Sequence, residues 1–486
     1  MSGQASDRAG RRASGAASAA AALGLALGIV LSVASCGGGG GVVGSGGTGR
    51  APGNVVGTVN GFGSVVVDGL AVDVRSARVV SETVPGQESV ADVKLGQRVS
   101  VDLNDAGVAS TVHVDAALAG PVDSVGADRL SMLGQRVDIA FAGGNGPVTQ
   151  FGGGLTQASD LRAGDAVEVH GVLVVQSGAS SIRATRIDKL ALPPAYLRAS
   201  GIVQTLAPDG SSLTFGGLTA DLAGASVLPA GARLASGQAV TLLAAADTLT
   251  SGAGTVHVRA AEVRIRALAD SAADQAVSGV LSHVDTQAHT FMLGALLVDY
   301  AAATLSPAGA TLADGQYARV QGVPTGADAL RADTVMLRVG ASGDDGELRG
   351  NISGYDAATG RFSVRDVAVD ASGAMLQGCP AAGLSNGLFV EIHGALTSSG
   401  IAAASIECES EPSEATVERE GIATAVDSAA SSFTLRTEGG ATLVVRWSDS
   451  TYFGGVTPQT LTGREVQAEG VLDNGVLIAS KISRDD

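Results

Sequence analysis

Six histidines are the side chains of this chain best suited to metal binding or acid–base chemistry. A recurring glycine allows two of them to be tested, because the residue six positions after it can be compared between copies. That position holds, in order, Asp102, His170, Leu243, Gln321, His393 and Glu469. A ligand position does not accept leucine, so His170 and His393 are predicted to be solvent-facing strand residues.

Residues Gly383, Ser385 and Gly387 match GxSxG, the pattern of the turn that exposes a nucleophilic serine in α/β-hydrolases. That turn joins a strand to a helix, and the surrounding sequence predicts no helix. The motif also coincides with a Leu-x-x-Gly phrase that recurs along the chain. We therefore predict no catalytic residue and no enzymatic activity, and a hydrolase alternative would depend on Ser385.

Three further groups of residues could bind a metal ion. Residues 344–347 (Asp-Asp-Gly-Glu) carry the oxygen ligands that calcium prefers, but their place between two repeats favours a solvated linker. The acidic run 407–420 is interpreted in the same way. His283 and His289 flank a turn, and no cysteine or carboxylate is placed to complete a tetrahedral site. The sequence therefore predicts no bound metal and no cofactor.

The first 35 residues have the three-part form of a secretion signal. Three arginines supply the positive start, and an apolar run follows from about residue 16 to residue 31. The segment ends in Val-Ala-Ser-Cys, which resembles the lipobox of bacterial lipoproteins. The resemblance implies cleavage between Ser35 and Cys36 and attachment of diacylglycerol to the Cys36 thiol. A retained membrane anchor and a buried free cysteine are the alternatives.

The segment after Cys36 is rich in glycine up to residue 53, which predicts a flexible tether between the lipid and the folded part. Gly37, rather than aspartate, follows the lipidated cysteine and resembles the sorting signal of outer-membrane cargo. We therefore expect a cell-envelope protein that faces the periplasm at the outer membrane. The inner membrane is the alternative.

Two cysteines, Cys379 and Cys408, remain after lipidation of Cys36. Both belong to one repeat, and thiols in an oxidising compartment tend to pair. We predict a structural disulfide between them. Two separate buried thiols are the alternative.

Charge and aromatic content exclude some partners. The chain has 48 acidic and 31 basic residues, a net charge of −17, which disfavours nucleic acids and anionic membrane surfaces. Only 3% of the residues are aromatic, which leaves little for the stacking platforms that bind single strands or sugars. Trp447, Tyr452 and Phe453 are predicted to form the core of the last repeat. The expected partners are the membrane, through the N-terminal lipid, and another envelope protein.

The elements that must position these residues are repeats. Each begins with a glycine, namely Gly57, Gly120, Gly201, Gly279, Gly350 and Gly421. A second glycine precedes an alternating strand in each copy, at Gly96, Gly164, Gly237, Gly315, Gly387 and Gly463. We call these the opening and marker glycines. Their regular order predicts six copies of one unit.

The expected boundaries follow from these glycines. They are residues 1–35 for the signal peptide, 36–53 for the tether, and 54–116, 117–192, 198–268, 276–340, 347–409 and 418–484 for six β-repeats. Apolar residues alternate within each repeat, as in β-strands. Asp68-Gly69 and Asn60-Gly61 are predicted to be tight turns, because these residues tolerate positive φ. A Gly-rich insertion at 143–154 leaves the register of the second repeat open.

About five short strands in each repeat predict an all-β protein of about six small, five-stranded, OB-like barrels, since closure removes unpaired strand edges. The alternative is that the six units close into one propeller. The sequence leaves open whether the repeats form an extended array or a closed one.

The repeat phrase resembles an uncharacterised bacterial family, the domain of unknown function 5666, over most of residues 55–483. The resemblance implies the fold and an exported location, and no activity. We therefore expect a non-enzymatic, lipid-anchored envelope protein whose tandem modules bind protein or act as a spacer. The alternative is a periplasmic module that binds a small ligand or a divalent metal.

Overall fold

The computed structural model describes residues 53–104, 108–141, 145–176, 179–252, 255–268, 274–338, 346–409, 416–428, 430–437, 442–448, 451–454, 456–473 and 476–484. The predicted signal peptide and tether, with Ser35 and Cys36, lie outside this part. The chain divides into two units, Met1–Gly40 and Gly41–Asp486, and every described residue belongs to the second. None of the described residues lies in a helix long and apolar enough to cross a membrane.

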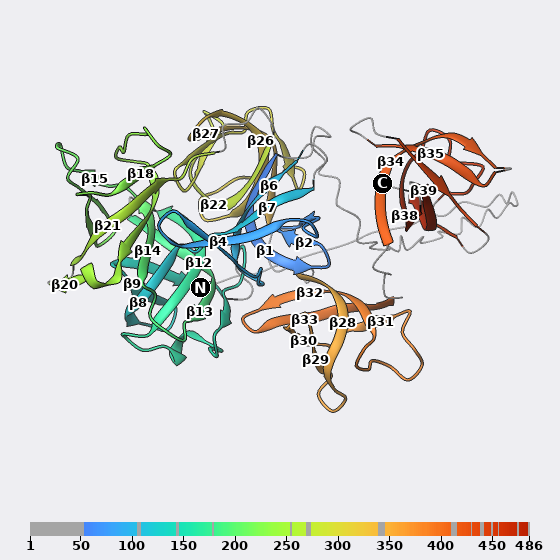
Figure 1. Ribbon diagram of the computed structural model, residues 1–486, viewed down its shortest axis with the longest axis horizontal. Helices are drawn as coiled ribbons and strands as arrows, with labels where there is room; N and C mark the ends of the chain where they lie inside the picture. Colours follow the sequence, from blue (N-terminus) through green and yellow to red (C-terminus); the bar gives the residue numbers. More distant parts are fainter. Residues whose placement is uncertain are drawn as a thin grey trace, which may run out of the picture. The chain divides into compact units, whose positions relative to one another are not determined.

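Strands and two 3-10 helices are the regular elements of the described chain, and they fall into six groups (Figure 1). The first group holds β1 (Asn54–Phe62), β2 (Val65–Val67), β3 (Leu70–Val72), β4 (Arg78–Val84), β5 (Gln87–Val90), β6 (Arg98–Leu103) and β7 (Ala109–Val114). The second holds β8 (Leu118–Val125), β9 (Arg129–Met132), β10 (Gln135–Ile139), β11 (Gln150–Gly152), η1 (Ala158–Asp160), β12 (Ala166–Gln176) and β13 (Ala179–Lys189). The third holds β14 (Tyr196–Ile202), β15 (Thr205–Leu206), β16 (Ser212–Phe215), β17 (Leu218–Asp221), β18 (Ser226–Leu228), β19 (Ala239–Ala245), η2 (Ala246–Thr248), β20 (Thr250–Gly252) and β21 (Thr255–Ile265).

The three remaining groups each hold six strands. The fourth holds β22 (Gln275–Asp285), β23 (Thr290–Leu293), β24 (Leu296–Asp299), β25 (Thr304–Ser306), β26 (Tyr317–Gly326) and β27 (Ala329–Arg338). The fifth holds β28 (Gly346–Asp356), β29 (Arg361–Val364), β30 (Val367–Asp370), β31 (Met375–Gln377), β32 (Phe389–Thr397) and β33 (Gly400–Glu409). The sixth holds β34 (Thr416–Asp427), β35 (Ser432–Arg436), β36 (Thr442–Arg446), β37 (Tyr452–Gly454), β38 (Glu465–Asp473) and β39 (Val476–Arg484).

Each group closes into a small barrel. In the second group, β8 pairs with β9 and β12, β10 pairs with β9 and β13, and β12 pairs with β13, so the ring has five strands. The fourth, fifth and sixth groups repeat this order. In the third, β14 and β15 together take the place of the first strand. In the first, the Ala109 amide joins β7 to β3 by donating to the Asp73 carbonyl (3.0 Å).

The predicted fold class is therefore confirmed: the described chain is an all-β series of small five-stranded, OB-like barrels. A propeller blade is an open four-stranded sheet, so units that each close on themselves do not form the alternative propeller. The insertion in the second repeat leaves its ring intact, because β11 adds to the outer end of β13 in parallel register.

The marker glycines hold the first strand of each barrel to the fourth. All six have a φ between +74° and +89°, a conformation that costs other residues about 1–2 kcal/mol. Each donates its amide to a first-strand carbonyl two residues after the opening glycine, at 2.8 or 2.9 Å. The acceptors are Val59, Val122, Val203, Leu281, Ile352 and Ala423. The repeated glycine thus marks the point at which the barrel closes.

The backbones of the fourth and fifth strands also approach each other closely within a barrel. The fourth strand carries a β-bulge, where Gly171 pairs with Ala184 in the second barrel and Gly470 pairs with Ala479 in the sixth. A Cβ on Gly171 or Gly470 would collide with a carbonyl oxygen of the fifth strand. In these two barrels the strands therefore come together only because the fourth-strand residue is a glycine.

The first strands also pair between barrels. The start of β1 pairs with β22 of the fourth barrel, and the end of β1 pairs with β28 of the fifth, both in parallel. The first strands of the second and third barrels, β8 and β14, also pair, but in antiparallel register. The apolar cores follow these contacts, since one buried cluster spans the second and third barrels and another spans the first and fifth. Barrels therefore contact partners beyond their neighbours in sequence.

One of the two predicted turns is wrong. Asp68 and Gly69 form the predicted tight turn, with φ values of 47° and 79°, between β2 and β3. Asn60 and Gly61 instead lie inside β1. A Cβ on Gly61 would collide with the Glu347 carbonyl on β28, so this glycine allows two barrels to approach each other.

Replacement of a marker glycine by alanine should destabilise its barrel through backbone strain. Nothing lies within 4 Å of a Cβ placed on Gly387, and its φ is +85°. We expect Gly387→Ala to destabilise the fifth barrel by about 1–2 kcal/mol. Hydrogen exchange of peptides that cover β28 and β32 measures this change. Gly373→Ala, at an equally open glycine without positive φ in the same barrel, is the control and should exchange as the unmodified chain does.

Candidate functional site: a polar junction of three barrels

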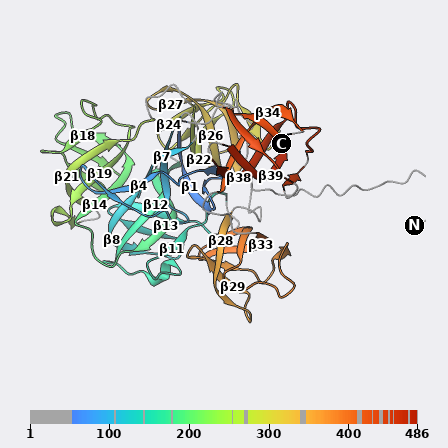
Figure 2. The same cartoon turned by 45° about the vertical axis from the view of Figure 1, so that its right-hand side comes forward.

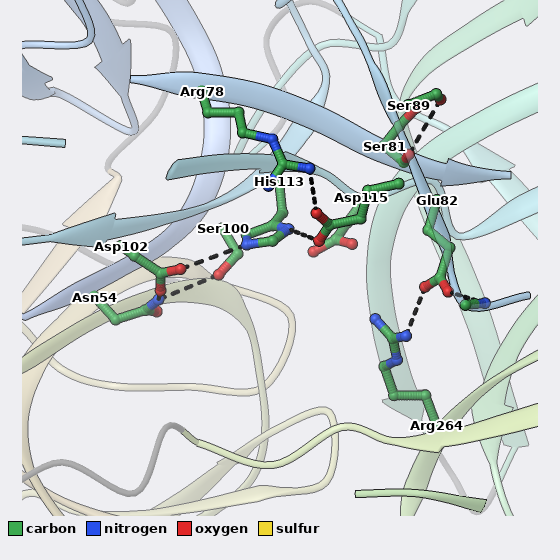
Figure 3. A network of polar contacts seen from close by, with 12 residues as sticks. Asn54, Arg78, Ser81, Glu82, Ser89, Ser100, Asp102, His113, Asp115 and Arg264 are labelled. Atoms are coloured by element: carbon green, nitrogen blue, oxygen red, sulfur yellow. Dashed lines mark hydrogen bonds and ion pairs between the residues drawn. The ribbon is translucent and has the colours of Figure 1, made fainter. Parts of the chain in front are cut away.

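Charged side chains of the first three barrels meet around the link between the first and second barrels. We call this group the polar junction and define it by Glu82, Asp115, His170, Arg198 and Arg264. Glu82 lies on β4 and Asp115 directly follows β7, while His170 lies on β12. Arg198 and Arg264 lie on β14 and β21 of the third barrel. Figure 3 shows Glu82, Asp115 and Arg264 with their surroundings.

Arg198 is the buried centre of the junction. Its Nε donates to the Ala116 carbonyl at 2.7 Å, and its Nη1 donates to the Glu82 carbonyl at 2.8 Å. Burial lowers the pKa of this guanidinium, and the nearby Asp115 carboxylate opposes that shift. One side chain of the third barrel therefore binds the backbone of the first barrel and of the following link.

Asp115 lies between two guanidinium groups of the third barrel. Its Oδ1 is 3.6 Å from Arg198 Nη2, and its Oδ2 is 3.5 Å from Arg266 Nη2. Burial by itself would raise the pKa of this carboxyl, but Arg266 and Arg198 outweigh burial and hold the pKa below its ordinary value. The carboxylate is therefore charged at neutral pH and links the first barrel to the third.

A second ion pair joins the same two barrels. Arg264 Nη2 lies 2.6 Å from Glu82 Oε2 and 3.1 Å from Glu262 Oε1, so one guanidinium bridges a carboxylate from each barrel (Figure 3). The side chains of Glu82 and Glu262 are 10% and 5% exposed. The Arg264 side chain is 45% exposed, so the two carboxylates of this bridge are buried while its guanidinium still contacts water.

His170 corrects the prediction of a solvent-facing histidine. The residue is fully buried, because the link that carries Asp115 covers the outer face of β12. Its Nδ1 lies 3.1 Å from the Asp115 carbonyl oxygen, and its Nε2 lies 3.0 Å from Glu168 Oε1. His393 repeats the pairing with Glu391 at 3.0 Å, and its side chain is 32% exposed. The repeated position is thus on the outside of its own barrel, where a neighbouring segment covers His170 and leaves His393 partly exposed.

His113 lies beside the junction on the first barrel, on β7 (Figure 3). Its Nε2 is 3.4 Å from Asp102 Oδ2, and its Nδ1 is 3.6 Å from Glu88 Oε1. Asn54 Nδ2 donates to Asp102 Oδ1 at 2.9 Å. Within the described residues, no group of three or more His, Cys, Asp or Glu side chains is placed to hold a metal ion.

A second buried polar cluster joins the first and fourth barrels. The Asp68 carboxylate accepts hydrogen bonds from the Thr58 amide at 2.7 Å and from the Tyr317 hydroxyl at 2.9 Å. Arg319 donates to the Asp68 carbonyl at 2.9 Å, and Arg338 Nη1 lies 3.8 Å from Asp68 Oδ1. Burial and the Asp68 charge raise the pKa of the Tyr317 hydroxyl, so it remains a donor. Both clusters can therefore join one barrel to another.

The sequence contained one weak signal for the junction. Arg198 is the only charged residue in the strand Tyr196–Ile202, whose other members are apolar or small. A charge at such a position predicts a buried partner. Glu82 and Arg264 gave no signal, because each lies on a strand that carries other charged residues, Arg78 on β4 and Glu262 on β21.

The GxSxG segment is a loop before a strand. Ser385 is exposed between β31 and β32, and the Gly387 amide bonds to Ile352 as the other marker glycines do. His283 and His289 have φ values of 52° and 55°, and the His289 ring packs edge-on against Tyr300 at 5.6 Å. Ser385, His283 and His289 therefore do not meet in one site.

Cys379 and Cys408 form a disulfide in the fifth barrel, with an S–S distance of 2.05 Å. It joins the segment after β31 to β33. Ser35 and Cys36, the predicted cleavage and lipidation residues, lie outside the described residues.

Parts of both acidic linkers are strands. Asp344 and Asp345 lie outside the described residues, whereas Gly346 and Glu347 begin β28. Burial and the nearby Glu391 raise the pKa of Glu347. In the run 407–420, residues 407–409 belong to β33 and residues 416–420 to β34, so the expectation of a solvated linker is wrong at both ends.

The predicted aromatic core of the sixth barrel is confirmed for two of its three residues. Trp447 and Phe453 pack against the buried cluster, and the Trp447 ring lies 6.2 Å from Phe433 and 6.1 Å from Phe453. Tyr452 is 65% exposed.

Comparison with known families supports the repeat interpretation. Residues 119–188 and 420–483 match the model of DUF5666, a domain of unknown function. The two segments correspond to the second and sixth barrels, so the resemblance to this family expected from the repeat phrase is confirmed there. No curated protein matches the chain.

Solved structures with similarity to this chain are small β proteins. A copper(II)-bound variant of CusF from Escherichia coli is 14% identical, with a TM-score of 0.13, and covers 16% of this chain and 100% of its own. Apo-CusF from Escherichia coli is 15% identical, with the same TM-score and the same coverage. Unr CSD456 from Drosophila is 14% identical, with a TM-score of 0.12, and covers 43% of this chain and 96% of its own.

Loss of Arg198 should separate the third barrel from the first. Arg198→Met keeps most of the apolar side chain and removes the charge. Asp115 then has one fewer partner, and the carbonyls of Ala116 and Glu82 lose the hydrogen bonds that Arg198 donates. We expect a loss of about 3 kcal/mol of stability in urea unfolding. Arg129→Met, at an exposed ion pair with Asp128, is the control and should leave the midpoint unchanged. An unaltered midpoint for Arg198→Met would contradict the junction.

Acid should weaken the junction through Glu168. Burial raises the pKa of this carboxyl, but the hydrogen bond and charge interaction with His170, together with the nearby Arg198 and Lys94, outweigh burial, and the pKa is lowered. A lowered folded-state pKa means that the carboxylate stabilises the fold above the unfolded-state pKa of about 4.3 and that this contribution disappears as the pH falls through the lower value. Glu168→Gln should cost about 1–2 kcal/mol at pH 7 and much less at pH 3. Urea unfolding at both pH values measures the difference, and an equal cost at both would refute it.

Proposed function

We propose that this chain is a non-enzymatic, lipid-anchored protein of the bacterial cell envelope whose tandem barrels bind other proteins. The observation that carries the proposal is the use of the outer barrel surface. Arg198, Asp115 and Glu82 join the first and third barrels, and Asp68 and Tyr317 join the first and fourth. These charged and polar residues thus act in contacts between the surfaces of barrels.

Attachment to the membrane is assigned to Cys36, with cleavage after Ser35 and the segment up to residue 53 as the tether. The Cys379–Cys408 disulfide supports an oxidising compartment outside the cytoplasm, because disulfides persist there. We assign the protein to the periplasmic face of the outer membrane. The partner is another envelope protein rather than a nucleic acid, since the net charge is −17.

Replacement of Cys36 tests the anchor. Cys36→Ala removes the thiol that accepts the lipid, so the protein should lose palmitate labelling and move from the membrane fraction to the soluble fraction. Metabolic labelling with radioactive palmitate and fractionation of cells measure both. Ser45→Ala, in the same tether, should retain the label and the membrane location. Continued labelling of the Cys36→Ala protein would overturn the anchor assignment.

A further inference from the structure

Three barrels line one small, open cavity with a volume of about 210 Å³. The second barrel contributes Val175 and Ser180, the third contributes Ile202 and Gln204, and the fourth contributes His283 and Met292. Four of these residues lie on β12, β13, β14 and β22, which are labelled in Figure 2. The cavity is thus a feature that no barrel forms by itself.

His283 lines the cavity from a backbone conformation that favours glycine. It lies in a β-bulge of β22, four residues after the opening glycine, and its φ is 52°. The same position has a φ of 64° at Gly354 and of 47° at Ala425. The first three barrels hold Gly61, Ser124 and Thr205 there. The fourth barrel alone places an aromatic ring at this position, and strain at a residue that lines a cavity points to a function.

Met292 also departs from the repeat. It lies opposite Ser282 across β22 and β23. The matching residue is Ser363 in the fifth barrel and Thr434 in the sixth, each opposite another hydroxyl residue. The fourth barrel thus has a long thioether where these barrels have a short hydroxyl side chain. Two departures from one repeat at one cavity indicate that the cavity has a use of its own.

Three polar side chains at the cavity are available to a ligand. The side chains of Ser180, Gln204 and His283 make no hydrogen bond or ion pair with any other residue that the structure describes. Their hydroxyl, amide and imidazole groups can each donate and accept a hydrogen bond. Among the described residues that line the cavity, none is Asp, Glu, Lys or Arg. A neutral ligand therefore suits this lining better than an ion does.

The rest of the lining suits an aromatic ring. Val175, Ile202 and Ala295 supply apolar surface, and Gly237 and Gly294 have no side chain to fill the space. The thioether of a methionine makes favourable contacts with aromatic rings. An engineered apolar cavity of about 150 Å³ holds benzene. The present volume of about 210 Å³ therefore leaves room for one ring with a small substituent.

We propose that this cavity binds a small, neutral aromatic molecule that carries one hydroxyl group, a phenol. The ring lies against the Met292 thioether and the apolar wall. The hydroxyl group of the ligand exchanges hydrogen bonds with the polar side chains Ser180, Gln204 and His283. Binding requires neither a protein partner nor the lipid anchor, so this site is separate from the proposed function.

NMR of the methionine methyl groups tests the site in the full chain in detergent, with para-cresol as the probe. The chain has five methionines, so isotope labelling of these methyl groups gives few signals, and Met292→Ser assigns that of Met292. The bound ring should move the Met292 signal upfield to saturation, with a dissociation constant on the order of 0.1–1 mM. Met375, which is 67% exposed in the fifth barrel, is the internal control and reports any effect of the probe on the detergent.

Replacement of His283 by the residue of the fifth barrel tests the hydrogen bond. His283→Gly should weaken para-cresol binding by about three- to tenfold, because one partner of the hydroxyl group is lost. His289→Gly is the matched control, because it removes a second histidine of the fourth barrel that has positive φ and does not line the cavity. This control should bind para-cresol as the unmodified chain does. Toluene, which lacks the hydroxyl group, should bind the unmodified chain roughly three- to tenfold more weakly than para-cresol. Circular dichroism shows that the variants are folded.

Four results would overturn the proposal. They are a Met292 signal that does not move up to about 5 mM para-cresol, a shift that the Met375 signal matches, equal binding of toluene, and equal binding by the His283→Gly chain. A soft metal ion such as silver(I) that moves the Met292 signal where para-cresol does not would also overturn it, since the site would then be a metal site.

Discussion

Closure of each barrel depends on two backbone hydrogen bonds between the first strand and the turn before the fourth. In the first barrel the Gly96 amide donates to the Val59 carbonyl, and the Val59 amide donates to the Gln97 carbonyl. The turn reaches this geometry only with a left-handed residue, which is why glycine recurs there in all six copies. The bulge pair, such as Gly171 and Ala184, then lets the fourth and fifth strands complete the ring.

A barrel closed in this way has its apolar residues inside, and its outer surface is free to differ between copies. The second, third and fourth barrels use that surface to bind one another or the first barrel, through Arg198, Tyr317 and the valines of β12. One unit, repeated, therefore supplies both the fold and the contacts that join its copies.

The sequence predicted the features that a single unit determines. Alternating apolar residues and the marker glycines depend on neighbours within about 70 positions, and each copy repeats them, so the all-β barrel could be inferred. The burial of His170 could not, because it depends on the link that carries Asp115 and on how the link crosses β12. The turn predicted at Gly61 was wrong for the same reason, since this glycine instead allows β28 of another barrel to pack against β1.

Strand β1 is shared by three barrels, since its start pairs with β22 and its end with β28. A ribosome completes β1 long before it makes either partner, and an exported chain crosses a membrane in the same order. Until residues 275–348 emerge, the backbone groups of residues 54–56 and 61–62 that pair with β22 and β28 have only water or other proteins to bond. Production of the first barrel by itself would leave those edges permanently open, and truncation before the fourth barrel should make the remaining fragment prone to aggregate.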